Sequence, residues 1–349
     1  MKCGFITDTH YGARKGSQIF HDYFEKFYSE VFFPTLDEQG IDTVVHMGDV
    51  FDNRKNIDFW SLNWAKRVVF DPLQERNIKT YLIVGNHDAY YKNTNNINSL
   101  QSLLREYDNL HLIYECEEKK IGDLKVLFIP WICSDNKEQT LDTIRSTDAK
   151  IGVGHLELNG FYAYRGHKQQ GAHMEADIFS NFSKVFSGHY HTRSDDGKVY
   201  YLGNPYEIYW NDVDDPRGFH IFDTETLEME PVNNPFKMFH KIYYDDTDIN
   251  SFDFSMYESK IVKLIVNKRS NLKKFEMFID KLYQSGIHEL KIVDMFDISD
   301  VSLDDEDVEK SEDTLTILNE YVDLSGDEYD KSKIKNMIQD IYKSAFEVV

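Results

Sequence analysis

Five short apolar runs in this chain each end in side chains of the types that bind metal ions. Such runs, bounded by glycine, are typical of buried strands, and in layered α/β proteins functional side chains gather where parallel strands end. One such ending could arise by chance, but five of them, with glycine next to four, indicate a shared site. The side chains at these ends are Asp8 with His10, Asp49, Asn86, His155, and His189 with His191.

The central ending is the stretch TVVHMGDVFD, residues 43–52, in which Asp49 follows an apolar run. A carboxylate at the end of a buried strand is unfavourable unless positive charge meets it. We therefore expect Asp49 to bridge two divalent cations about 3.5–4 Å apart. The alternative is an ordinary turn or helix N-cap, where Gly-Asp is common.

The remaining donors divide into two sets around this carboxylate. A mixture of imidazole and carboxylate suits manganese, iron or zinc better than magnesium, which prefers oxygen ligands. No thiolate is among them, so a structural zinc site is not expected. Two such cations would lower the pKa of a bound water and neutralise charge on phosphoryl oxygens. We expect Asp8, His10 and His191 to complete one site, and Asn86, His155 and His189 to complete the other.

Three neighbouring residues have predicted supporting roles. His87 lies next to Asn86 but is not needed as a ligand, so we expect it to act as the general acid that protonates the leaving oxygen. Asp52 and Asp88 could each orient an imidazole. Each could equally cap a helix, and the sequence leaves both interpretations open.

Helical periodicity appears between the strand-like runs. An aromatic stripe in residues 19–32 predicts core packing. Residues 58–74 predict a helix whose Phe59, Trp60 and Trp64 indicate either core packing or a subunit interface. Further elements are expected as helices at residues 100–104 and 135–147, the latter capped by Asp135, and as strands at residues 2–7, 81–84, 124–129, 151–153, 184–186, 199–202, 219–222 and 228–232.

The pattern changes near residue 236. Residues 260–266, 272–285 and 290–295 predict a small β-α-β module, with Gly286 placed to end its helix. Apolar residues at positions 334, 337, 338, 341, 342, 345 and 346 then predict an amphipathic terminal helix. This helix either folds back on its own chain or docks on a partner.

Charge and composition limit the function classes. The 349-residue chain carries a net charge of -22, which argues against a general nucleic-acid binder. Residues 297–330 hold 14 acids and one base, so they account for 14 − 1 = 13 of those charges and predict a solvated linker. The sequence contains no apolar run long enough for a membrane span and no signal-peptide pattern, and its three cysteines are far apart. We therefore expect a cytoplasmic protein.

The strand-end motifs together resemble the motif set of the calcineurin-like metallophosphoesterases. Within that superfamily the chain is similar to the nuclease subunits of SbcD-like DNA-repair and recombination complexes, including those of T-even-like phages. The superfamily motifs are DTH at residues 8–10, GDVFD at 48–52, GNHD at 85–88, GH at 154–155 and GHYH at 188–191. The subgroup motifs are GDVFDNRK at residues 48–55, HLELNGFY at 155–162 and DDPRGFHIFD at 214–223.

This resemblance implies an α/β fold, a two-sheet sandwich with flanking helices, followed by a small α/β capping domain and a C-terminal helical segment. The expected domains are a nuclease domain at residues 1–235, a DNA-contacting capping domain at 236–300, and an acidic linker with an ATPase-binding helix at 301–349. The implied activity is manganese-dependent hydrolysis of DNA phosphodiesters, both exonucleolytic and endonucleolytic, with two Mn²⁺ ions; Mg²⁺ is less suited. The implied partners are DNA, an SbcC-like ABC-type ATPase and a second copy of the chain.

Two other function classes compete with a DNA nuclease. A phosphatase or small-molecule phosphodiesterase could use the same metal centre, but protein phosphatases of this superfamily carry Arg and Glu where Asn53 and Asp88 stand here. A non-catalytic scaffold is disfavoured because every expected ligand is present. Asp52 replaces a histidine found in some family members, which leaves open whether exonucleolytic or endonucleolytic cleavage dominates.

Overall fold

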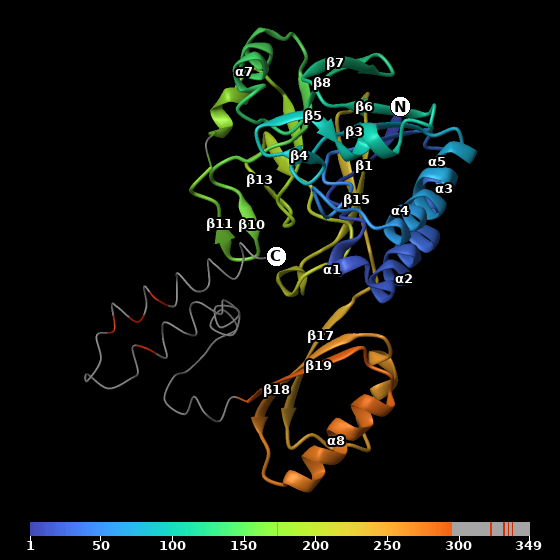
Figure 1. Ribbon diagram of the computed structural model, residues 1–349, viewed down its shortest axis with the longest axis vertical. Coiled ribbons are helices and arrows are strands. Elements are labelled where there is room, and N and C mark those ends of the chain that lie inside the picture. Colours follow the sequence, from blue (N-terminus) through green and yellow to red (C-terminus); the bar gives the residue numbers. More distant parts are fainter. Residues whose placement is uncertain (173, 295–321, 323–330, 332–333, 335–336, 338–349) are drawn as a thin grey trace. The chain divides into compact units, whose positions relative to one another are not determined.

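We describe a computed structural model of the chain that covers residues 1–172, 174–294, 322, 331, 334 and 337 (Figure 1). Residues 1–293 form one compact unit. Most of the predicted acidic linker and most of the predicted terminal helix lie outside the described residues. The predicted domain boundary at residue 235 stays a prediction.

The first of two six-stranded sheets has the order β16-β15-β1-β2-β3-β6. Strands β1, β2, β3 and β6 are parallel, and β15 and β16 extend the sheet as antiparallel neighbours. The parallel strands therefore all end at the same edge. Their bounds are β1 Lys2–Ile6, β2 Thr43–His46, β3 Lys79–Ile83, β6 Leu110–Ile113, β15 Gly218–Asp223 and β16 Met229–Asn233.

The second sheet has the order β13-β14-β12-β9-β8-β7. Its four central strands are parallel, and an antiparallel strand closes each edge. Their bounds are β7 Glu117–Ile121, β8 Leu124–Ile129, β9 Ile151–His155, β12 Lys184–Gly188, β13 Ser194–Asp195 and β14 Val199–Tyr201.

The two sheets pack face to face through a shared apolar layer. Phe5 of β1 stacks on Phe222 of β15 with ring centroids 4.9 Å apart, and both rings contact Phe186 of β12 at 5.4 and 5.0 Å. These buried rings belong to one core cluster that draws on both sheets. The predicted α/β two-sheet sandwich is confirmed.

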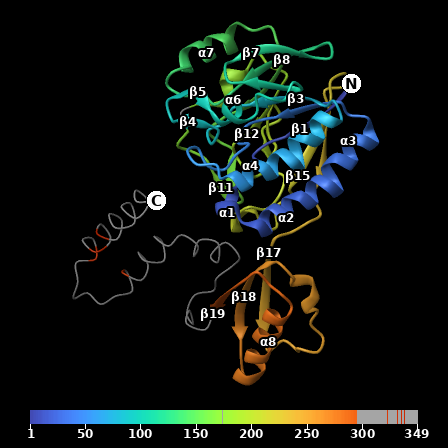
Figure 2. The same ribbon diagram turned by 45° about the vertical axis from the view of Figure 1, so that its right-hand side comes forward.

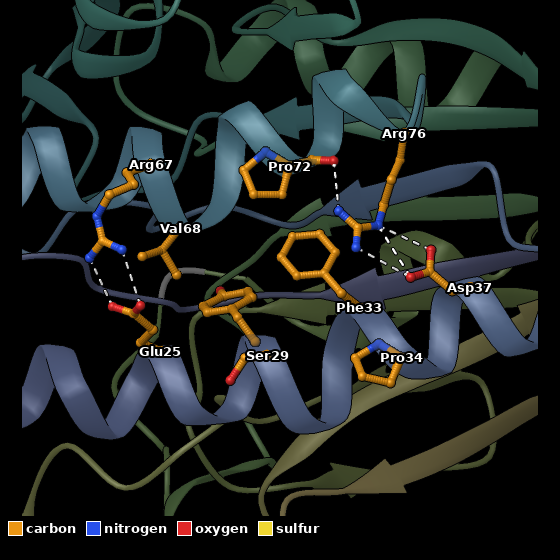
Figure 3. A pocket seen from close by; sticks show the side chains of 10 residues that line it. Glu25, Ser29, Phe33, Pro34, Asp37, Arg67, Val68, Pro72 and Arg76 are labelled. Carbon is orange, nitrogen blue, oxygen red and sulfur yellow. Dashed lines mark hydrogen bonds and ion pairs between the residues drawn. The ribbon is translucent and has the colours of Figure 1, made fainter.

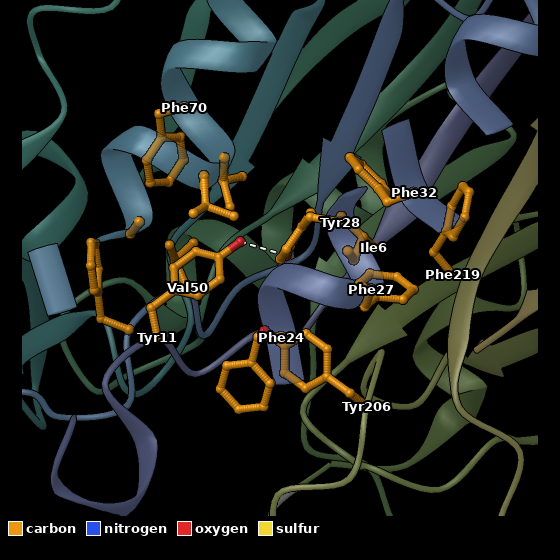
Figure 4. Packing of buried hydrophobic residues seen from close by; sticks show 14 of the residues in the cluster. Ile6, Tyr11, Phe24, Phe27, Tyr28, Phe32, Val50, Phe70, Tyr206 and Phe219 are labelled. Carbon is orange, nitrogen blue, oxygen red and sulfur yellow. Dashed lines mark hydrogen bonds between the residues drawn. The ribbon is translucent and has the colours of Figure 1, made fainter. Parts of the chain in front are cut away.

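Helices cover the other face of the first sheet, and the aromatic stripe lies there (Figure 4). Phe24 stacks on Tyr206 with centroids 3.9 Å apart, and Phe32 contacts Phe219 of β15 at 4.9 Å. The core-packing prediction for residues 19–32 is thus confirmed. Two helical runs form this layer, each interrupted by a π-helical turn that shifts the 3.6-residue period. They are α2 Gln18–Phe27, η1 Tyr28–Phe32 and α3 Phe33–Gln39, then α4 Phe59–Ala65, η2 Lys66–Phe70 and α5 Asp71–Glu75.

A shallow groove of about 330 Å³ lies between these two helical runs (Figure 3). Arg67 reaches across it to Glu25, with guanidinium nitrogens 2.9 and 3.1 Å from the carboxylate, and Arg76 reaches Asp37 at 3.0 Å. Because these pairs are exposed, each contributes about 0–1 kcal/mol. The buried rings beneath them provide most of the contact between the runs.

The second sheet is covered by α7 (Lys137–Ser146) and η3 (Ala176–Phe179), which share a core cluster with β8 and β12. Figure 2 shows α7 beside β8. The helix predicted at residues 135–147 spans Lys137–Ser146, and its N-cap position is Asn136. The prediction that Asp135 caps this helix is wrong. Asp135 lies one residue earlier, where its carboxylate accepts a hydrogen bond from Thr94 Oγ1 at 2.9 Å.

The small module has the strand order β17-β18-β19, with β17 parallel to β18 and its own apolar cluster. The sequence predicted β18, α8 and β19 but missed β17. Gly286 follows α8 with φ +80°, as expected for a residue that ends a helix. The module elements are β17 Phe239–Asp245, β18 Ile261–Lys268, α8 Leu272–Gln284 and β19 Glu289–Asp294.

Short elements complete the described chain. No helix among the described residues is long and apolar enough to cross a membrane. The short elements are α1 Ala13–Gly16, β4 Ala89–Tyr91, β5 Thr94–Asn98, α6 Ser99–Leu103, α7 Lys137–Ser146, β10 Tyr162–Tyr164, β11 His167–Lys168, η3 Ala176–Phe179, η4 Trp210–Asp212 and η5 Phe254–Tyr257.

Candidate metal centre

The seven predicted ligands come together at the carboxyl ends of both sheets. Asp8, Asp49 and Asn86 follow the parallel strands β1, β2 and β3, whereas His155 ends β9 and His189 follows β12. The two sheets are tied together at this edge, since His155 Nδ1 lies 2.7 Å from the carbonyl oxygen of Met47. The topology therefore brings residues that are up to 183 positions apart into one cluster.

One half of the cluster is formed by Asp8, His10 and His191. A ligand atom from each of the three lies within 4.8 Å of the other two. His10 Nε2 is 3.2 Å from His191 Nε2 and 3.8 Å from Asp49 Oδ2. Asp49 thus faces this half, as expected for a bridging carboxylate.

The other half is formed by Asn86, His155 and His189, which also lie next to Asp49. Asp49 Oδ2 is 3.3 Å from His155 Nε2, and ligand atoms of Asp49, His155 and His189 lie within 4.8 Å of one another. Asn86 Oδ1 is 2.9 Å from His155 Nε2 and 3.0 Å from His189 Nδ1. The geometry brings each predicted set together, while their role as ligands stays a prediction.

Four of the seven residues have backbone conformations that L-amino acids rarely adopt. Their φ angles are +52° at Asp8, +46° at His10, +54° at Asp49 and +87° at His189. Such conformations are unfavourable by about 1–3 kcal/mol each and persist where the surrounding structure fixes them, often at functional sites. Here the Asp8 amide donates to the Gly48 carbonyl at 3.0 Å and the His10 amide donates to the Asp49 carbonyl at 3.1 Å.

Glycines next to the ligands leave room for close approach of the chains. A Cβ atom at Gly85 would lie 2.2 Å from Asp49 Oδ1, and one at Gly188 would lie 2.8 Å from Asp8 Oδ2. Any side chain at these positions would displace the carboxylates. The glycines found beside the predicted ligands therefore have a direct steric cause.

Burial and neighbouring charges set the protonation of the cluster. Burial raises the pKa of Asp8 to about 6 and lowers the pKa of both His189 and His191 to about 3. Burial would also lower the pKa of His155, but the Asp49 carboxylate outweighs it and raises that pKa to about 9.

The buried donor set fits divalent cations. Imidazole nitrogens and carboxylate or amide oxygens face one another at 2.9–3.8 Å, and the two nitrogens of His10 and His191 approach closely. Facing acceptors of this kind are unfavourable unless protons or positive ions lie between them. Nitrogen and oxygen donors without thiolate match manganese, iron or zinc.

His87 and Asp52 lie beside the cluster. The His87 amide donates to Asp49 Oδ1 at 2.7 Å, its ring is 4.9 Å from that of His10, and its Nδ1 is 2.5 Å from the Asp52 carbonyl oxygen. Burial lowers the pKa of His87, and the Asp49 carboxylate opposes this shift. The Asp52 carboxylate is 3.3 Å from His10 Nδ1, so it lies where it can orient that imidazole.

Asp88 contacts backbone amides instead of an imidazole. Its buried carboxylate accepts from the amides of Gly85, Val50 and Phe51 at 2.9, 3.0 and 3.3 Å. Burial raises the pKa of Asp88 to about 7. Asp88 therefore joins the loop after β2 to the loop after β3, and its contacts are with backbone amides and the Ser99 hydroxyl.

Sequence reasoning missed the residues that hold His191. Arg217 is buried, donates to the His191 carbonyl oxygen and the Asn204 side chain, and pairs with Asp215 at 2.9 Å. Asn204 Nδ2 lies 3.4 Å from His191 Nδ1. Arg217 lies in the DDPRGFHIFD motif, which could have drawn attention to it. The sequence alone, however, did not predict which residues Arg217 contacts.

Comparison with known proteins shows which family the chain belongs to. The calcineurin-like phosphoesterase family profile matches residues 1–193. Exonuclease subunit 1 of Enterobacteria phage T4 is 35% identical over 297 residues, which cover 85% of each chain. A protein of Invertebrate iridescent virus 3 that bears the name phosphoesterase is 24% identical over 57% of this chain and 56% of its own length. A solved archaeal phosphodiesterase aligns with 67% of this chain at 14% identity and a TM-score of 0.35.

Proposed function

Because the chain belongs to the calcineurin-like phosphoesterase family, we propose that it is a two-metal DNA nuclease that works as a subunit of a DNA recombination or repair complex. The single observation that carries this proposal is the convergence of two donor sets on the Asp49 carboxylate. The phage relative named an exonuclease subunit supports DNA as the substrate and a larger assembly as the working form.

The proposed cofactor is a pair of Mn²⁺ ions. Asp8, His10, Asp49 and His191 would hold one ion, and Asp49, Asn86, His155 and His189 would hold the other. When bound, the ions supply an activated water and neutralise charge on the phosphoryl oxygens. The His87 amide donates to Asp49 and the His189 amide donates to Asp8, so these two carboxylates are placed before substrate arrives.

His87 is the proposed general acid. Its Nδ1–H donates to the Asp52 carbonyl, which fixes the ring and leaves Nε2 available. In the imidazolium form, Nε2–H would give its proton to the leaving oxygen of the cleaved phosphodiester, and the ring would return to the neutral state. Asp52 would orient His10 through its carboxylate, and Asp88 would hold the ligand loops in place.

The proposed partners are a second copy of the chain, DNA and an ATPase subunit. Phe59 and Trp60 on α4 are 89% and 45% exposed, and we propose that they form a homodimer interface. The module that starts at residue 236 would contact DNA, and the terminal helix would bind an SbcC-like ABC-type ATPase. Both roles are proposed from the family resemblance.

The test compares the full chain with His87→Ala on linear DNA in Mn²⁺. We expect both proteins to bind two manganese ions, measured by metal analysis after gel filtration, and the variant to cleave about 10²- to 10⁴-fold more slowly. His111→Ala, which removes an exposed histidine on β6, is the matched control and should cleave like wild type.

Each other outcome would change a specific assignment. Undiminished cleavage by His87→Ala would overturn the general-acid role, and loss of a manganese ion would make His87 a ligand. If the wild-type chain hydrolysed p-nitrophenyl phosphate but left DNA intact, the phosphatase alternative would replace the nuclease.

A further inference from the structure

A pocket of about 360 Å³ begins beside His155, on the Asn86 side of the metal centre. It is walled by the loop between β4 and β5, the loop after β8 and the end of β9. Its size is that of a small-molecule site. Its lining includes Lys92, Asn93, Trp131, Cys133, Lys137 and Glu157.

The indole of Trp131 forms a half-buried wall between this pocket and the metal ligands. Its ring centroid is 5.2 Å from that of His189 and 6.1 Å from that of His155. Trp131 is also one of the residues that line the cavity, together with His155. Trp131 is therefore in contact with the proposed phosphate site and with the pocket at once.

The backbone around Trp131 is fixed on three sides. Its amide donates to the Val84 carbonyl at 2.8 Å, and its carbonyl accepts from Asn95 Nδ2 at 2.8 Å and Asn136 Nδ2 at 3.0 Å. The Asp135 amide donates to the Asn93 carbonyl at 3.1 Å. These bonds tie the β4–β5 loop to the loop after β8, so the aromatic wall is preformed.

Charge around the opening favours an anionic ligand. Lys92 and Lys137 are exposed at the rim, and Glu157 is the acidic residue in the lining. A flat aromatic wall with flexible lysines beside it matches a nucleotide, in which a base stacks and neighbouring phosphates meet ammonium groups.

We propose that this pocket, here called the Trp131 pocket, holds the base of a nucleotide adjoining the cleaved phosphate, stacked on the Trp131 indole. This inference rests on the proposed nuclease function. Each base has a flat ring face, so the pocket serves binding and positioning without strong sequence preference. Trp131 is a substrate-positioning residue in this assignment.

The first test compares two single-stranded substrates of equal length, a thymidine oligonucleotide and one made of abasic residues. Loss of one base–aromatic stack weakens binding about 5- to 150-fold. We expect wild type with Mn²⁺ to cleave the thymidine strand with a kcat/KM larger by a factor in that range. Trp131→Ala should lose most of this preference, and Trp131→Phe, which keeps a ring, should retain it.

The second test measures nucleotide binding in the absence of cleavage. Thymidine 5′-monophosphate added to the manganese-loaded chain should quench tryptophan fluorescence, and deoxyribose 5-phosphate should not. The quench should disappear in Trp131→Phe, because the stacked indole is gone, even though that variant still prefers the thymidine strand. Circular dichroism of both variants checks that the fold is intact.

The outcomes separate this inference from the proposed function. Equal cleavage of both strands by wild type, together with no fluorescence change, would overturn the Trp131 pocket as a base site and leave the nuclease in place. Failure of wild type to cleave either strand would instead overturn the nuclease. Quenching by deoxyribose 5-phosphate would show that the pocket takes sugar phosphates without a base.

Discussion

Individual residues in this centre are held by backbone amides of neighbouring loops. The carboxylate of Asp8 accepts from the amide of His189 at 3.0 Å, and the amide of His87 donates to Asp49. A ligand on one loop is thereby positioned by the backbone of another. Substitution of one such ligand should disturb its neighbour as well as remove a donor.

His220 on β15 lies outside this set and predicts a pH effect on stability. Its side chain is buried, and burial together with the nearby Arg193 guanidinium lowers its pKa to about 3. In the unfolded chain this imidazole titrates near pH 6.5. The unfolded state therefore takes up a proton first as pH falls, so the contribution to stability is present above pH 6.5 and is lost between about pH 6.5 and 3.

Replacement of His220 by leucine should flatten this dependence. Each pH unit within that window corresponds to about 1.4 kcal/mol for a single group. Urea unfolding of wild type and His220→Leu at pH 7, 6 and 5 measures the difference. Curves that fall in parallel would show that other groups carry the acid sensitivity.

The ligand residues could be predicted from sequence because each one marks the end of an apolar run. Asp52 and Asp88 were also predicted as supporting residues, but Arg217 and Trp131 could not be. Arg217 donates to the carbonyl oxygen of His191, 26 positions away, and the Trp131 ring packs beside the His189 ring. Neither contact has a periodicity or spacing that the sequence alone reveals, since both depend on how the loops after β14 and β8 lie in the fold.

At the scale of single elements, helix α4 presents two opposed surfaces. Trp64 is 1% exposed and packs on Tyr11 and His21, and its indole N–H donates to Glu25 at 3.1 Å. Phe59, five residues earlier, is 89% exposed. The sequence left core packing and a subunit interface as alternatives, and the two residues divide between a buried and an exposed surface.

We expect Trp64→Ala to lower the free energy of unfolding by about 3–5 kcal/mol, because it leaves a cavity in the aromatic core. Phe59→Ala should change it by no more than about 0.5 kcal/mol. If the exposed surface pairs two copies, Phe59→Ala should also lower the mass seen in sedimentation. Urea unfolding measures the first effect, and a large loss of stability in Phe59→Ala would mean that this ring is covered within one chain.

Long periodic elements were predicted well, and short edge elements were not. Strands β1, β2, β3, β8, β9 and β12 have buried apolar residues throughout most of their length, so their sequence signal is strong. The hairpin strands β4 and β5 are three and five residues long, and β5 is largely polar. Strand β17 has the sequence FHKIYYD, in which buried and more exposed positions are interspersed. This pattern predicts neither a strand nor a helix clearly.

At the scale of the whole molecule, the proposed ATPase contact lies at the C-terminal end of the sequence. Apolar positions recur there at helical spacing, and Met337 is 62% exposed. A docked partner would cover such a surface. We expect a chain truncated before Lys331 to keep nuclease activity in Mn²⁺ and to lose co-purification with a coexpressed SbcC-like ATPase.

A paired substitution sharpens this test. Ile338→Glu places a charge at an apolar position of the predicted helix, whereas Gln339→Glu places one at a polar position. The first should abolish co-purification and the second should leave it intact. Retained binding by the truncated chain would show that the partner docks elsewhere.

The wide sequence separation of the ligands has a consequence for biosynthesis. The proposed centre uses Asp8, which follows β1, and His191, which follows β12, so a nascent chain that has not yet reached His191 lacks a complete donor set. These two donors are 183 positions apart, and at about 5–20 residues per second roughly 10–40 s pass between the synthesis of the first and of the last. Until His191 has been added, the growing chain cannot assemble the proposed centre and is catalytically inert.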